Sequence, residues 1–312
     1  MAALDYGRRV EFGISVVPNA SELDAIRRAV GAADRSGLDL VGIQDHPYQW
    51  RFMDTWMLMA SLLAETERVR VFPDVTNLPL RPPAILAKQA ATLDVLSGGR
   101  FELGLGAGGF WDAVAAMGGP RRTPGESVEA LEEAIAIIRL AWSGERSVHF
   151  EGTYYSAHGY HPGPPPAHEM GIWVGAYRPR MLRLIGRLAD GWIPSLGYVG
   201  IPEIVKAQGV IDGAATEAGR EPAAIRRMVN VSGAIGPGAS GGAFSGSVDE
   251  WVALLAGWVT EVGLDTFILW PSDPDPGQVE TFGREVAPRV REEVARRRAA
   301  RAGSASHVEA PR

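Results

Sequence analysis

The chain has 312 residues, a formal net charge of −6 and no cysteine. Acids and bases are spread along the sequence, which argues against a protein that binds nucleic acid or an anionic membrane through a basic face. The absence of cysteine excludes disulfides, thiolate catalysis and cysteine-bound metals. The N-terminal stretch MAALDYGRRVEFG carries no apolar signal segment, and no apolar run approaches the roughly 20 residues of a membrane helix, so a cytoplasmic protein is expected.

Strands and helices are expected to alternate along the chain. Short apolar runs predict strands at residues 10–17, 38–44, 69–75, 101–105, 172–175, 191–194, 228–235 and 266–270. Helices are predicted at residues 22–35, 54–65, 83–96, 125–142, 179–189, 202–218, 248–262 and 277–300. Ser21 is expected to cap the first of these helices and Gly37 to end it.

About eight strand–helix units of this kind predict a parallel α/β fold, the (βα)8 TIM barrel, with an open doubly wound sheet as the alternative. One domain is expected over residues 1–302. After the fourth helix, residues 144–169 break the alternation with a hairpin-like piece and a proline-rich loop, and we interpret them as an insertion. The last ten residues, 303–312, are expected to form a disordered tail.

The second predicted strand ends unusually, in Gln44-Asp45-His46-Pro47 with Trp50 just beyond. In a TIM barrel the catalytic groups lie at the carboxyl ends of the strands. The other strands end in stretches rich in glycine, polar residues and aromatics: Asp74–Asn77, Gly104–Asp112, Gly175–Arg180 and Pro194–Tyr198. These ends are expected to share one pocket, with Trp50 as a wall. The alternative is structural, with Asp45 capping the next turn and His46 satisfied within the fold.

Two glycine-rich stretches indicate how a ligand could be held. Gly104–Gly109 contains G-x-G-x-x-G, but a dinucleotide-binding fold would need a strand about 20 residues further on, where a helix is predicted. Its glycines therefore suggest that a flat ligand approaches the backbone closely. Gly175, Ala176 and Tyr177 precede a helix whose free N–H groups suit an anion, with Arg178 close by, although an ordinary strand–helix turn is the alternative.

Four histidines crowd the insertion, at positions 149, 158, 161 and 168. Their spacing is irregular and the loop is rich in proline, so no metal site is predicted.

Three motifs together resemble the luciferase-like monooxygenase superfamily of flavin and deazaflavin oxidoreductases. They are LPLRPPAILAKQAATLDVLSGGRFELGLGAG (78–108), IWVGAYRPRMLRLIGRLADGWIPS (172–195) and DHPYQW (45–50). The Asp-His pair followed by tryptophan resembles the branch that uses the deazaflavin coenzyme F420. In glucose-6-phosphate dehydrogenases of that branch, the acid matching Asp45 contacts the coenzyme, and the residues matching His46 and Trp50 stand beside the reacting carbon.

The resemblance implies further contacts with the coenzyme. A non-proline cis peptide is expected near Pro73, Asp74 and Val75, where the bulge would press on the ring, and phosphate contacts are expected at Gly175, Ala176 and Tyr177. The cofactor-binding residues predicted on this basis are Asp45, Asp74, Val75, Asn77, Gly106, Ala107, Gly175, Ala176 and Tyr177.

The chain also departs from the sugar-phosphate enzymes. Gly109 stands where they carry a catalytic glutamate, and their phosphate-binding lysines have no clear counterparts, so that substrate is not expected. We expect an enzyme that transfers a hydride between F420 and a small organic substrate, with His46 exchanging the proton and Asp112 as the other candidate acid. The alternatives are an FMN-dependent monooxygenase and a non-catalytic coenzyme-binding protein, and a homodimer is kept open.

Overall fold

A closed ring of parallel strands forms the centre of the computed structural model, which describes residues 4–271 and 276–306. Within these residues the pairing order is β3–β2–β1–β12–β10–β9–β8–β5–β4. The ring closes because β4 continues β3 and pairs with β5, while Val71 forms a parallel bridge to Phe101. The strands are β1 (Glu11–Val16), β2 (Leu40–Ile43), β3 (Arg70–Pro73), β4 (Thr76–Asn77), β5 (Leu103–Gly106), β8 (Ile172–Val174), β9 (Gly191–Trp192), β10 (Arg226–Ile235) and β12 (Thr266–Pro271).

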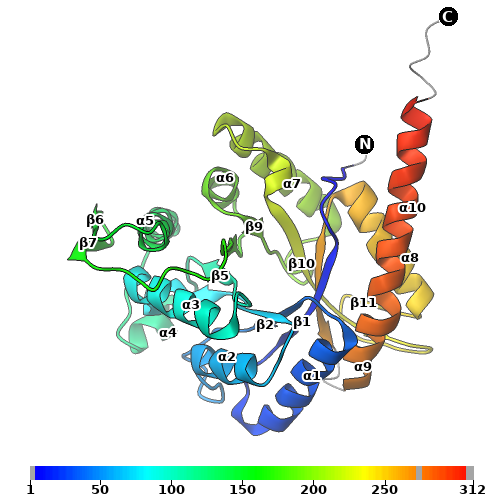
Figure 1. Ribbon diagram of the computed structural model, residues 1–312, viewed down its shortest axis with the longest axis horizontal. Helices are drawn as coiled ribbons and strands as arrows, with labels where there is room; N and C mark the ends of the chain where they lie inside the picture. Colours follow the sequence, from blue (N-terminus) through cyan, green and yellow to red (C-terminus); the bar gives the residue numbers. More distant parts are fainter. Residues whose placement is uncertain (1–3, 272–275, 307–312) are drawn as a thin grey trace, which may run out of the picture.

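Helices surround this ring (Figure 1). They are α1 (Leu23–Ser36), α2 (Thr55–Ala64), α3 (Pro83–Ser97), α4 (Trp111–Ala116), α5 (Pro124–Trp142), α6 (Pro179–Leu188), α7 (Ile201–Glu217), α8 (Val248–Gly257), α9 (Pro276–Thr281) and α10 (Ala287–Ser306). Large side chains fill the interior of the ring, among them Leu40, Phe72, Trp173, Met228 and Ile268. The predicted TIM barrel is confirmed, and the open sheet is excluded.

Shorter elements complete the connections. Three of them are 3-10 helical turns, η1 (Ala20–Glu22), η2 (Leu78–Leu80) and η3 (Pro222–Ala224). Two are π-helical: η4 (Trp258–Val262), after α8, and η5 (Phe282–Val286), between α9 and α10. In the glycine-rich loop after β10, a short strand β11 (Phe244–Gly246) pairs in parallel with β10. Sequence reasoning missed both β11 and α4.

Capping side chains explain several helix starts. Asp54 accepts hydrogen bonds from the backbone N–H groups at the start of α2, and Thr123 and Ser247 form capping boxes with Glu126 and Glu250. The predicted cap at Ser21 is wrong. Ser21 lies inside η1, and its backbone N–H donates to the side-chain Oδ1 of Asn19, which caps that turn. Helix α1 begins two residues later, without a side-chain cap.

Between α5 and β8 the chain forms an antiparallel hairpin of β6 (Val148–Glu151) and β7 (Ser156–Tyr160), at the left edge of Figure 1. His149 and His158 face each other across it, whereas His168 lies farther along, against the buried Asp94. In the described part of the chain, no three histidines or acids gather in a way that could hold a metal ion. At the other end of the chain, α10 continues to Ser306, four residues into the predicted tail; residues 307–312 lie outside the described residues.

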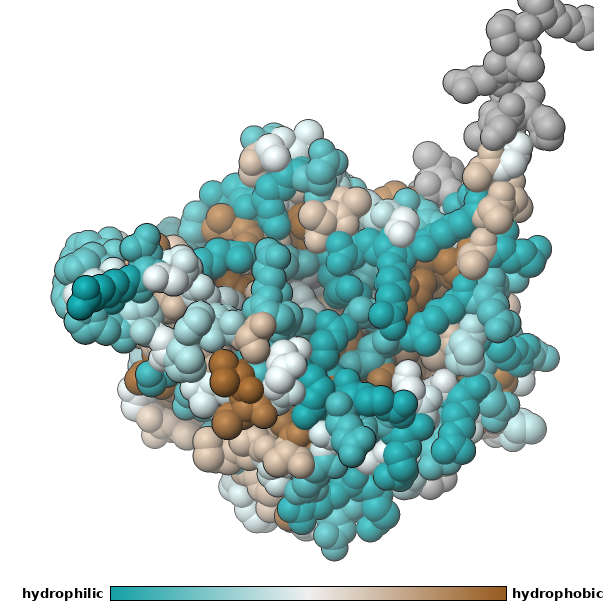
Figure 2. Space-filling view, in the orientation of Figure 1, coloured by the Kyte–Doolittle hydropathy of each residue, from teal (hydrophilic) through white to brown (hydrophobic). Residues whose placement is uncertain are grey.

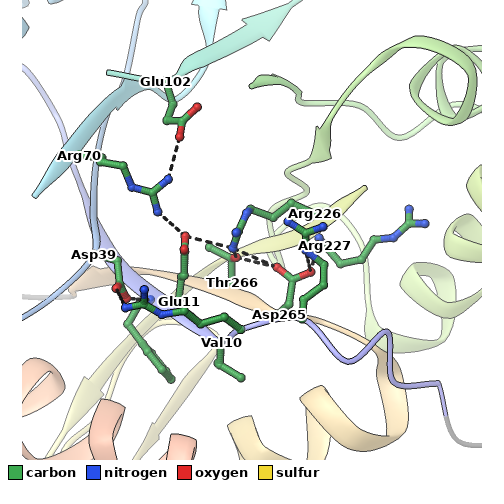
Figure 3. A network of polar contacts seen from close by, with 12 residues as sticks. Val10, Glu11, Asp39, Arg70, Glu102, Arg226, Arg227, Asp265 and Thr266 are labelled. Atoms are coloured by element: carbon green, nitrogen blue, oxygen red, sulfur yellow. Dashed lines mark hydrogen bonds and ion pairs between the residues drawn. The ribbon is translucent and has the colours of Figure 1, made fainter. Parts of the chain in front are cut away.

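A network of ion pairs joins the amino ends of the strands, opposite the strand ends where a site is expected (Figure 3). Arg70 bridges Glu11 and Glu102, and Arg226 pairs with Glu11 at 3.0 Å and with Asp265 at 3.5 Å. Each of these residues lies at or next to the first residue of a strand. This end of a TIM barrel serves stability, so the network is read as structural.

The face of the molecule shown in Figure 2 is largely hydrophilic, with an apolar patch over α3. Exposed residues of α2 and α3 form this patch, including Met57, Ile85 and Leu96. Among the helices of the described residues, none combines the length and apolar character that crossing a membrane requires.

Candidate functional site

A cavity of about 380 Å³ opens at the carboxyl ends of the strands. Its lining comes from segments that follow different strands: Gln44 and His46 after β2, Asp74 after β3, Gly175 after β8 and Ser195 after β9. Asn230 and Trp270 reach it from β10 and β12. The predicted meeting of strand ends in one pocket is therefore what the fold produces.

His46 lines this cavity beside two aromatic rings. Its imidazole lies 5.5 Å from the ring of Tyr48 and 5.7 Å from that of Phe110, measured between centroids. Burial lowers the pKa of His46 below its ordinary value, and the adjacent Asp45 carboxylate only partly opposes this. A neutral imidazole that faces a cavity can accept a proton from a bound molecule.

Asp45 points away from the cavity, although it precedes His46. Its carboxylate is fully buried and receives two hydrogen bonds of 3.1 Å from Arg81, one to each oxygen, and one of 3.0 Å from the backbone N–H of Asn77. Arg81 also pairs with Asp54, the cap of α2. Asp45 and Asn77 therefore hold the loop that carries His46, and neither lines the cavity.

Asp74 and Val75 both line the cavity, at the break between β3 and β4. The peptide bond between them is cis, as predicted. The Asp74 carboxyl accepts hydrogen bonds from Ser15 Oγ at 3.1 Å and from Asn230 Nδ2 at 3.2 Å. Burial raises the pKa of Asp74 to about 6, against the opposing effect of these donors and of Trp270.

Gly104 and Gly106 leave space for the backbone and side chains of residues 73–76 of the same chain. A Cβ on Gly104 would lie 1.9 Å from the Pro73 carbonyl oxygen, and one on Gly106 would lie 2.8 Å from a methyl of Val75. The predicted close approach is thus made by the bulge at residues 73–75. Gly106 and Ala107, which were predicted to bind the cofactor, do not line the cavity.

The stretch from Gly175 to Tyr177 lies between the cavity and the start of α6. Gly175 and Tyr177 line the cavity, whereas Ala176 is buried, with its carbonyl accepting from Trp192 Nε1. The Tyr177 hydroxyl accepts a hydrogen bond of 3.1 Å from the Ser195 backbone N–H. No side chain caps α6, so the N–H groups of its first turn are open to an anion.

Two of the predicted catalytic residues lie outside the cavity. Trp50 is 84% exposed, and the guanidinium of Arg51 stacks on its ring with 4.8 Å to the centroid. The Asp112 side chain is 92% exposed, because it lies in the first turn of α4 and pairs with Arg121 in solvent. In this structure neither acts as a pocket wall or as a cavity acid.

Sequence reasoning missed several residues of the lining: Ile193, Asn230, Ser232 and Trp270. Gln44 and Phe110 also line the cavity; they lie in strand ends that were expected to share the pocket, but neither was named as a site residue. Asn230 and Ser232 alternate with apolar residues in β10, in the sequence MVNVSGAI, and a polar residue at alternate positions of a buried strand is a signal that could have been used. Phe110 also carried a signal, as an aromatic residue directly after the glycines.

The lining contains several aromatic residues and, among the described residues, no arginine or lysine. Phe110, Tyr177, Tyr198 and Trp270 supply flat surfaces, and His46 and Asp74 are the groups in the lining that can change charge near neutral pH. A planar, uncharged part of a ligand suits this surface, while a phosphate would have to lie outside it.

The family model described as luciferase-like monooxygenase matches residues 9–240. An F420-dependent glucose-6-phosphate dehydrogenase of Microbacterium testaceum is 35% identical over 171 residues, which cover 53% of this chain and 50% of that protein. A phthiodiolone/phenolphthiodiolone dimycocerosates ketoreductase of Mycobacterium tuberculosis is 35% identical over 176 residues, covering 55% and 45%. The chain spans about half the length of these curated relatives.

Among solved structures, an F420-dependent secondary alcohol dehydrogenase in complex with an F420-acetone adduct superposes with a TM-score of 0.81. It is 19% identical, and the match covers 91% of this chain and 99% of that one. At this identity the likeness supports the fold alone.

Proposed function

This chain belongs to the luciferase-like monooxygenase family, and on that premise we propose that it transfers a hydride between coenzyme F420 and a small uncharged organic molecule. One observation carries the proposal: a protonatable histidine and a protonatable acid face one aromatic cavity at the carboxyl ends of the barrel strands. Relatives named as F420-dependent dehydrogenases support the choice of coenzyme.

The residues present fit a flat ring with a phosphate-bearing tail. Phe110, Tyr198 and Trp270 offer aromatic faces, and a Cβ on Gly197 would meet nothing within 4 Å, so the lining is open there. The uncapped start of α6, beside Gly175 and Tyr177, suits the phosphate. When bound, the coenzyme supplies the hydride chemistry, and the protein supplies position and electrostatics.

His46 is the residue that we propose moves the substrate proton. Its lowered pKa keeps the imidazole neutral at pH 7, ready to accept a proton as an alcohol is oxidised and to return it as a carbonyl is reduced. For Asp45 we propose an indirect role in place of the predicted contact with the coenzyme. The pair of Asp45 with Arg81 holds the loop, and the loop positions His46.

The lining also bears on the substrate. Because the described residues place no arginine or lysine in it, a sugar phosphate would find no counter-charge there. A neutral ketone or secondary alcohol needs none. One of the relatives is named as a ketoreductase, which agrees with this class.

Titration of the protein with F420 and with FMN, followed by fluorescence quenching, tests the proposal. We expect tighter binding of F420 and turnover of neutral ketones or secondary alcohols without oxygen. Tighter binding of FMN with oxygen-dependent turnover would place the chain among the monooxygenases instead. Tight F420 binding without turnover of any substrate would favour a coenzyme-binding protein.

A further inference from the structure

Asp74 differs from the other buried acids of the described residues. Those acids are Glu11, Asp45, Asp74, Asp94, Glu102 and Asp265. Arginine side chains pair with Glu11, Asp45, Glu102 and Asp265, and His168 pairs with Asp94. No basic side chain of the described residues pairs with Asp74, whose hydrogen-bond donors are all neutral. The acid without a counter-charge is therefore the one that faces the cavity.

The contrast with Asp45 shows what this difference does. Both carboxyls are buried at the ends of neighbouring strands, but Asp45 has the bidentate contact with Arg81 and Asp74 has hydroxyl and amide donors. A buried carboxyl without a cation favours its protonated form, and a protonated carboxyl has an O–H to donate.

Asn230 supplies a second, independent feature at the same place. The residue is 8% exposed, and its Nδ2 donates to Asp74 and to Ser195 Oγ, at 3.2 and 3.1 Å. Its Oδ1 is buried and has no hydrogen-bond partner in the described part of the chain. Leaving such an oxygen unsatisfied destabilises the protein, and a ligand donor in the cavity would satisfy it.

We propose that Asp74 binds the ligand of this cavity in its protonated form, donating a hydrogen bond to it while Asn230 Oδ1 accepts one from it, so that binding takes up a proton. The ligand class that meets both groups is a planar heterocycle with a carbonyl oxygen beside an N–H. The identity of that ligand rests on the proposed function, since a deazaflavin or flavin ring carries such an edge.

The surroundings of Asp74 keep the expected pH dependence simple. Ser15 of β1, Asn230 of β10 and Trp270 of β12 face it and do not titrate near neutral pH. Tyr177, a phenol of the cavity lining that interacts electrostatically with Asp74, has a pKa raised by burial and stays neutral. His46 shares the lining and does titrate, so it needs a control variant.

The test is the pH dependence of F420 affinity between pH 5 and 8, read by fluorescence quenching. In the wild type we expect constant affinity below the Asp74 pKa of about 6 and a fall of up to about tenfold per pH unit above it. Asp74→Asn should lose this slope, and any ionisation of the coenzyme itself is common to both proteins. His46→Gln and the exposed-acid control Asp112→Asn should keep it.

The outcomes separate the two proposals. If F420 binds with a pH profile that Asp74→Asn leaves unchanged, the proton linkage is wrong and the proposed coenzyme stands. If only FMN binds, the same titration with FMN decides the linkage, and if neither ring binds, both proposals fail. Carboxyl ¹³C NMR of the ligand-free protein gives a second reading: one aspartate resonance should titrate near pH 6 and vanish in Asp74→Asn. If every carboxyl titrates below pH 5, the linkage is overturned.

Discussion

Replacing Arg81 by methionine would leave the buried Asp45 carboxylate without its cation. Arg81 supplies two of the three hydrogen bonds to that carboxylate and a third bond, of 2.9 Å, to Asp54. Removing one partner of a buried ion pair typically costs about 3–5 kcal/mol, because the remaining charge stays out of water. We expect Arg81→Met to lower the free energy of unfolding by this amount, and the loop that carries His46 to loosen with it.

Urea unfolding monitored by tryptophan fluorescence measures the effect. The matched control is Arg121→Met, which breaks the solvent-exposed pair with Asp112 and should cost less than about 1 kcal/mol. Adding Asp45→Asn to Arg81→Met should recover a large part of the loss, since no buried charge is then left unpaired. If the free energy of unfolding of Arg81→Met lies within about 1 kcal/mol of the wild-type value, the Asp45–Arg81 pair does not hold the loop as we infer.

Three further predictions concern groups that titrate. His46→Ala should reduce turnover by about 10²–10⁴-fold while F420 affinity stays near the wild-type value, and stopped-flow hydride transfer compared with binding separates the two. Asp74→Asn should stabilise the ligand-free protein at pH 7.5 by up to about 3 kcal/mol and have little effect near pH 3.5. The Asp74 pKa rises from 3.8 to about 6 on folding, so folding stability falls as pH rises through this range; urea unfolding at both pH values checks this, and an equal effect at both would contradict it. Finally, Glu102 and Asp94 hold the pKa of His168 above its ordinary 6.5, so its contribution to stability is present below pH 6.5 and is lost as pH rises through the folded value. His168→Gln should therefore destabilise the protein more at pH 5.5 than at pH 9 in thermal unfolding, and a loss that does not depend on pH would show a purely steric role.

The barrel and the place of the cavity could be predicted, because both follow from local patterns. Alternating apolar strands and amphipathic helices indicate the fold, and parallel strands bring their carboxyl ends to one rim. His46, Asp74 and Gly175 were found in this way.

The direction of each side chain at the rim could not be predicted. Whether Asp45 faces the cavity depends on Arg81, which is 36 positions away in the sequence. Asp112 lies in a helical turn, α4, that sequence reasoning missed, and its neighbour Arg121 draws it into solvent. The Asp74 carboxyl lacks a cation because of what β1, β10 and β12 contribute, which only the closed barrel reveals.

The residues around Val75 are tightly packed, whereas other parts of the cavity lining have free space, so the two parts differ in how much sequence change they tolerate. Any side chain at Gly104 would collide with the Pro73 backbone, and one at Gly106 would displace Val75, so the part of the cavity lined by Val75 tolerates little change of sequence. A side chain at Gly197 would meet open space. Two other residues of the lining, Tyr198 and Phe110, are exposed. New substrate preferences can therefore arise by divergence at the outer rim without disturbing the barrel, and saturation libraries at these three positions are where altered selectivity should be sought.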